Sequence, residues 1–188
     1  MMKLSEMKLL ATDGKLVIES DLDNRQVKLK KAIENRDWQG AETLLRLGAD
    51  VNFSYPPFGN TLLLDLIEVA AYTGQWRSEA VGGVLEWLIS HGALLNKVNL
   101  QGNSAMIMAA SYGDYELLEK LYKLGANVNA VNIYGESVFT VAAAQNILTL
   151  LLELVPMEVV DSKIQSELVR LIECDDCAVV GSLVYDET

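Results

Sequence analysis

LYKLGANVN, residues 121–129, occurs in altered form twice more, as LLRLGADVN at 44–52 and LISHGALLN at 88–96. Each copy is an apolar, helix-like run that ends in Gly-Ala and is followed by an apolar residue and Asn. The glycines Gly92 and Gly125 are 33 residues apart, whereas the interval before Gly92 is longer. A fixed interval between similar segments is the sequence mark of a repeat architecture. The chain is therefore predicted to contain an internal repeat.

A second marker repeats at the same interval, as Gly102-Asn103-Ser104 and again as Gly135-Glu136-Ser137. Ser is a favoured N-cap residue, so a helix is expected after each of these serines. Between them, Gly113 ends the first helix and a second helix follows at 115–124, with apolar residues at 3/4 spacing. Helix, tight turn, helix and extended connector form a unit that buries its apolar face only by stacking on its neighbours.

The repeated unit resembles the ankyrin repeat family, whose period is also 33 residues. The matching segments are GADVN at 48–52, GANVN at 125–129 and AASYGDYELLEKL at 109–121, and the resemblance covers residues 28–155. It implies an all-α solenoid of helix–turn–helix units with β-hairpin fingers. The Thr-Pro-Leu-His tetrad of the family is absent, because the corresponding segments read TLLL, SAMI and SVFT. We expect the fold to rest on apolar stacking, with less local stability than a consensus array.

Three regions follow from this pattern. Residues 1–25 form an N-terminal extension, in which Asp13-Gly14 between two apolar runs predicts a short β-hairpin. Residues 26–156 hold the ankyrin-repeat array of about four repeats, and residues 157–188 hold a helical C-terminal cap and an acidic tail. A terminal cap is expected because the open end of a repeat stack must be covered.

The second repeat is enlarged at two main places. Four additional residues before Ala70 are close to one helical turn, so they are expected to lengthen the first helix without changing its buried face. Six more fall in QWRSEAVGG, residues 75–83, which we interpret as a longer helix–helix loop carrying Trp76 and Arg77. This loop is a candidate contact region, since loops commonly carry function. Alternatively, it is a tolerated insertion in which Trp76 covers the lengthened helix.

Composition and charge limit the function classes. The chain has 188 residues, of which 51% are hydrophobic, so a folded core is expected. Its formal net charge of −11 argues against nucleic acid as a ligand and permits a basic protein partner. No apolar run reaches the length of a membrane span, and residues 1–13 lack the apolar core of a secretory signal. A soluble, cytoplasmic protein that does not bind membranes is the expectation.

No set of residues makes a catalytic case. His91, the one histidine, directly precedes the helix-ending Gly92, where a structural role fits the helix dipole. Cys174 and Cys177 have C-x-x-C spacing, but a closed zinc site needs four ligands and a redox pair belongs at a helix start after a strand. We expect no enzyme activity, no cofactor and no metal; a labile disulfide between the two cysteines stays open.

The connectors between repeats carry apolar residues where polar residues are usual in ankyrin fingers. Exposed apolar patches on a soluble protein mark interaction sites, and aromatic residues are common binding anchors. Mutual burial of neighbouring connectors is the alternative, chiefly for the aliphatic residues. The predicted partner-binding residues, including the two in the loop, are Phe53, Tyr55, Phe58, Trp76, Arg77, Val98, Leu100, Val131, Ile133 and Tyr134.

These features predict a non-catalytic protein–protein interaction module. The more specific hypothesis is an acidic inhibitor of the immunity or antitoxin type, which occludes a basic partner such as a toxin or an enzyme. The acidic excess suits it, because nine acidic and only two basic residues follow Leu152, although a solvated tail would have the same composition. The alternative is an adaptor or scaffold that bridges two proteins without inhibiting either.

Overall fold

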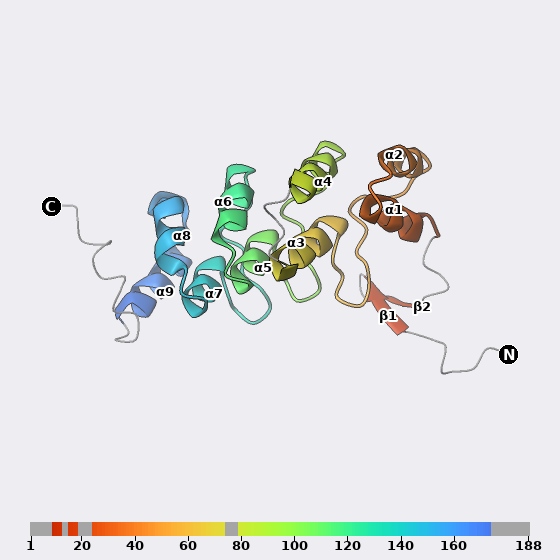
Figure 1. The fold of residues 1–188 in the computed structure, drawn as a ribbon. Helices are drawn as coiled ribbons and strands as arrows, with labels where there is room; N and C mark the ends of the chain where they lie inside the picture. The colour runs from red at the N-terminus through yellow and green to blue at the C-terminus, as the bar shows by residue number, and fades with distance from the viewer. Residues whose placement is uncertain (1–8, 13–14, 19–23, 74–78, 174–188) are drawn as a thin grey trace. The chain divides into compact units, whose positions relative to one another are not determined.

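The computed structural model describes residues 9–12, 15–18, 24–73 and 79–173 (Figure 1). The chain comprises two compact units, Met1–Leu100 and Gln101–Thr188. The described residues are mainly helical, as predicted from the repeat.

The first unit begins with two short strands and continues with two helix pairs. Strands β1 (Leu9–Thr12) and β2 (Lys15–Ile18) are antiparallel, with Leu9 opposite Ile18. The expected Asp13-Gly14 turn lies outside the described residues. The helices, which form the pairs α1/α2 and α3/α4, are α1 (Asn24–Glu34), α2 (Trp38–Arg46), α3 (Leu62–Thr73) and α4 (Glu79–Ser90).

The core of the first unit is aliphatic. Leu29 on α1, Ile67 on α3 and Leu88 on α4 are at most 1% exposed. Asp37 begins α2, because its side-chain Oδ1 accepts the N–H of Gly40 at 2.9 Å. Gly48 follows the end of α2 with φ +90°, a conformation that glycine adopts without steric cost.

The second unit is built from helices that pack in register. In Figure 1, α5 lies against α7, α6 against α8, and α9 covers α7. Its core contains Met106, Leu118, Phe139 and Leu168, each at most 1% exposed. The elements are α5 (Ala105–Ser111), α6 (Tyr115–Lys123), α7 (Val138–Ala144), α8 (Leu148–Leu154), the 3-10 helix η3 (Met157–Val159) and α9 (Ser162–Glu173).

The predicted helix starts in this unit are confirmed by their caps. Ser104 Oγ accepts the N–H of Ile107, and Ser137 Oγ accepts the N–H of Thr140, each at 3.3 Å. Thr140 completes a capping box, because its Oγ1 accepts the N–H of Ser137 at 2.9 Å. Gly113, which was expected to end α5, follows it with φ +69°.

The enlarged repeat agrees with one prediction and corrects another. Helix α3 has 12 residues where α5 has 7, which confirms the lengthened first helix. The loop predicted at 75–83 is wrong in its second half, because α4 begins at Glu79 and includes Gly82 and Gly83. A glycine inside a helix costs only about 1 kcal/mol relative to alanine, so two of them do not end α4. Residues 74–78, with Trp76 and Arg77, lie outside the described residues.

Within the described ranges, none of the helices combines the length and apolar character that crossing a membrane requires.

Candidate functional site

The third connector, residues 130–136, is organised by one buried side chain. Asn132 is 7% exposed, and its Oδ1 accepts the N–H groups of Tyr134 at 3.0 Å and Glu136 at 2.9 Å. Its Nδ2 donates to Oε2 of Glu136 at 2.8 Å and to Oδ1 of Asn103 at 3.0 Å. A backbone bridge between Val131 and Ser137 closes the turn. The amide therefore uses both its donor and its acceptor groups to hold the connector in one shape.

A backbone contact fixes the third connector to the residues that precede α5. The N–H of Ile133 donates to the carbonyl oxygen of Gln101 at 3.0 Å. Gly102 permits this approach, since a Cβ there would lie 3.0 Å from Asn132 Cα and from Ile133 N. Because the backbone makes this contact, the side chains are left outside: Ile133 is 67% exposed, Tyr134 66% and Val131 44%. Mutual burial is thus not the arrangement adopted by these three residues.

The first connector, residues 53–59, has a comparable frame within the first unit. The N–H of Tyr55 donates to the carbonyl oxygen of Asn60 at 2.7 Å. The N–H of Leu100 donates to the carbonyl oxygen of Phe58 at 2.9 Å. The buried Asn99 donates from Nδ2 to Oδ1 of Asn60 at 3.0 Å. Phe58 and Leu100 remain 54% and 46% exposed, and Val98 is exposed as well.

Tyr55 is a correction to the predicted partner-binding set. Its side chain is buried, and its hydroxyl donates to the carbonyl oxygen of Gln26 on α1 at 2.8 Å. The Lys30 ammonium lies 5.2 Å from the centroid of its ring, and Phe53 meets it edge to face with centroids 5.0 Å apart. Phe53 is accordingly only half-exposed. Tyr55 serves as an anchor of the first connector rather than as an exposed contact residue.

The environment of Tyr55 favours its neutral form. Burial raises the pKa of the Tyr55 phenol well above its ordinary value of about 10, and the carboxylate of Asp65 adds to the increase. The phenol therefore stays protonated and keeps its hydrogen bond over the physiological pH range.

Comparison with known proteins adds an independent observation. Residues 88–142 match a family model described as ankyrin repeats (many copies). The chain contains ankyrin repeats in this segment. The match begins in the last turn of α4 and includes α5, α6 and the first part of α7. A search of curated proteins found no match.

Ankyrin repeats indicate a protein–protein interaction module, and the family is generally non-catalytic. The ring of His91 stacks on Trp87 with centroids 4.0 Å apart, and its Nδ1 lies 2.8 Å from the carbonyl oxygen of Trp87. Among the described residues, no group of three or more His, Cys, Asp or Glu side chains is placed to hold a metal ion. Cys174 and Cys177 lie outside these residues.

Some exposed apolar residues of the ankyrin array were not predicted. Val69 on α3 is 61% exposed, Tyr72 near the end of the same helix is 80% exposed, and Leu94 is exposed just after α4. The lengthened helix was predicted from the sequence, but the exposure of these side chains on it was not. The exposure of these side chains depends on where α1 ends relative to α3, and the sequence does not give that relationship.

Proposed function

We propose that this protein binds another protein through the exposed apolar side chains of its connectors. The contact residues in the first unit are Phe58, Val98 and Leu100, and those in the second unit are Val131, Ile133 and Tyr134. The observation that carries the proposal is the third connector, where Asn132 fixes the backbone while Ile133 and Tyr134 remain two-thirds exposed.

A connector whose backbone is already ordered lowers the conformational cost of binding. Ordering a flexible loop on binding costs conformational free energy, whereas a connector already in shape avoids most of that cost. Aromatic and aliphatic side chains on such a frame are typical hot spots, whose truncation costs about 2 kcal/mol or more. Trp76 and Arg77 remain predicted contact residues, and Tyr55 is left out because it is buried.

We further propose that the partner is basic and that binding inhibits it, as an immunity protein or antitoxin inhibits a toxin in the cytoplasm. The formal charge of −11 supports the sign of the partner, because opposite charges speed encounter. The third connector, AVNIYGE, contains one acidic and no basic residue, so its own net charge is negative, like that of the whole chain.

The test is to purify the partner with the tagged chain and to assay the pure pair. An inhibitor forms a one-to-one complex that abolishes the partner's activity, and its association rate falls steeply between about 0.05 and 0.5 M salt. An association rate that is independent of salt would contradict the electrostatic part of the proposal.

An adaptor that bridges two proteins is the alternative. It is favoured by one observation: each compact unit has exposed connector side chains of its own, Phe58 and Leu100 in one and Ile133 and Tyr134 in the other. A tight complex in which the partner keeps full activity would reject inhibition and support the adaptor.

A further inference from the structure

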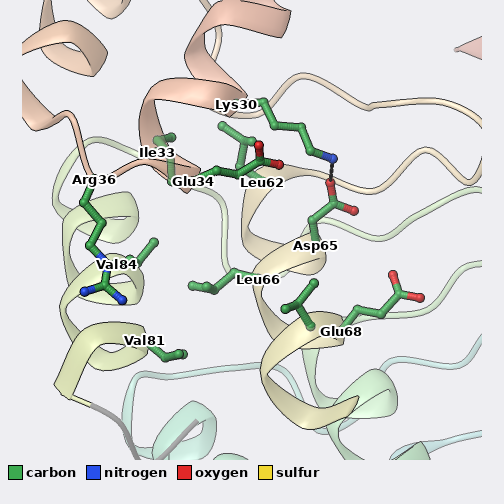
Figure 2. Close-up of a pocket in the computed structure, with 11 residues that line it drawn as sticks. Lys30, Ile33, Glu34, Arg36, Leu62, Asp65, Leu66, Glu68, Val81 and Val84 are labelled. Carbon is green, nitrogen blue, oxygen red and sulfur yellow. Dashed lines mark hydrogen bonds and ion pairs between the residues drawn. The ribbon is translucent and has the colours of Figure 1, made fainter. Parts of the chain in front are cut away.

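The first unit contains an open pocket of about 410 Å³ between α1, α3 and α4 (Figure 2). Its volume lies in the range of about 300–1,000 Å³ that ligand pockets occupy. Its walls combine aliphatic side chains with charged groups. The aliphatic lining includes Leu66, Val69 and Val84, and the charged lining includes Glu34 and Arg36.

The pocket follows from the additional turn of α3. Helix α1 ends at Glu34, and the chain turns at Arg36 with φ +57°, whereas α3 continues to Thr73. Val69, on the additional turn, is 61% exposed although it lines the pocket. In Figure 2, Leu66 points from α3 into the space that α4 borders on the other side. The enlargement thus leaves apolar side chains without a cover from the shorter neighbouring repeat.

The charged groups around the pocket are not equally engaged. Lys30 forms an ion pair with Asp65, as the dashed line in Figure 2 shows. Glu68 accepts a hydrogen bond from Nδ2 of Asn60 at 2.9 Å. The carboxylate of Glu34 is exposed and has no hydrogen bond or ion pair with the described residues. The guanidinium of Arg36 is also exposed and has none with these residues. Of the two cations that line the pocket, Lys30 is therefore already paired, whereas Arg36 has no ion pair in the described part of the chain.

We infer that this pocket binds a short segment of the partner in which an apolar side chain is flanked by Lys or Arg. The apolar side chain contacts Leu66, Val69 and Val84, and the flanking cation pairs with Glu34. Arg36 has donors only, so it binds a backbone carbonyl oxygen of the same segment. The inference rests on the proposed function in one respect, namely that the partner is basic.

The charges argue for this occupant over others. A second copy of the chain carries the same net charge of −11 and is repelled. Nucleic acid and anionic lipid surfaces are repelled for the same reason. A basic, apolar segment can pair with the exposed carboxylate of Glu34, and its apolar side chain gains from leaving water.

The experiment uses methyl-labelled full-length protein and two capped pentapeptides, GKLKG and GELEG. The basic peptide is expected to shift the methyl resonances of Leu66, Val69 and Val84 in a saturable way. The acidic peptide, which has the same apolar residue, is expected to leave them unchanged. Equal responses to both peptides would overturn the inference, and so would no response to either, because the pocket would then be filled by the chain itself.

Glu34→Lys is the discriminating variant, and Glu153→Lys is its matched control. Both residues are exposed in the last turn of a helix, where lysine interacts better with the dipole than glutamate does, so neither variant should lower the melting temperature. Glu34→Lys is expected to weaken binding of the basic peptide about fivefold or more, with Glu153→Lys unchanged. An equal loss in both variants would show only long-range attraction and would overturn the role of Glu34.

The connector variant Ile133→Asp with Tyr134→Ala separates this inference from the proposed function. It is expected to leave peptide binding at the pocket unchanged, because neither residue lines the pocket. If it abolishes partner binding while the pocket fails to respond to GKLKG, the proposed function stands and the inference falls. If the pocket responds but this variant still binds the partner, the connector proposal falls instead.

Discussion

The side-chain nitrogen of Asn132 lies 3.0 Å from the side-chain oxygen of Asn103, and this contact joins the third connector to the residues before α5. Asn132 also accepts two backbone N–H groups of its own turn. One buried amide thus determines both the shape of the turn and its attachment. The neighbouring Tyr134 makes no comparable contribution through its ring, which is exposed.

Replacing Asn132 with Ala should therefore destabilise the second unit. Two backbone donors lose their acceptor, and each net hydrogen bond is worth about 1 kcal/mol, so a loss of about 2–3 kcal/mol is expected. Urea unfolding followed by circular dichroism measures it. Tyr134→Ala is the control and should change stability by less than about 0.5 kcal/mol. Equal effects of the two substitutions would show that Asn132 does not organise the connector.

Gly59→Ala should cost more than Gly92→Ala, although both glycines have positive φ, +73° and +86°. A Cβ on Gly59 would lie 2.7 Å from Cγ of Leu100, whereas a Cβ on Gly92 meets no atom within 4 Å. We expect about 1 kcal/mol for Gly92→Ala, from backbone strain alone, and about 2–3 kcal/mol for Gly59→Ala. Adding Leu100→Ala should recover part of the extra cost in a double-mutant cycle. Strict additivity would mean that Leu100 does not cover Gly59.

Stability should fall at alkaline pH because of Tyr55. The pKa of its phenol is raised in the folded state, so its contribution is complete below the unfolded value of about 10 and is lost as the pH rises above that value. Tyr55→Phe should cost about 1 kcal/mol at pH 7, through the lost hydrogen bond to Gln26, and should lose less stability than wild type between pH 10 and 11. Parallel stability profiles for the two proteins would contradict this explanation.

The helices that begin at short polar residues were predictable from the sequence. Ser104 and Ser137 each precede an apolar run, and a cap depends only on residues three or four positions apart. The end of α6 was predicted less well. The helix predicted over 115–124 includes Leu124, but this residue is the C-cap of α6 and is 39% exposed. Chain direction changes at a helix end, so helical spacing no longer places the side chain there.

The candidate site was predictable only in part, because burial depends on distant residues. Tyr55 and Phe58 are three positions apart and look equivalent in the sequence, yet Tyr55 is buried and its hydroxyl donates to the carbonyl oxygen of Gln26 on α1. Phe58 has no such partner and is exposed. For the same reason, the pocket beside α3 could not be predicted, since it depends on where α1 ends relative to the additional turn.

The most direct test of the central claim is the double variant Ile133→Asp with Tyr134→Ala. Its matched control is Val159→Asp with Met157→Ala, which alters exposed apolar residues of the same unit outside the connectors. Binding to the partner purified with the wild-type chain is measured by calorimetry, and stability by thermal unfolding. The proposal predicts that the connector variant weakens binding by about 2 kcal/mol or more at an unchanged melting temperature, while the control binds as wild type does. Unchanged binding by the connector variant, or a large fall in its melting temperature, would contradict the claim that Ile133 and Tyr134 face a partner.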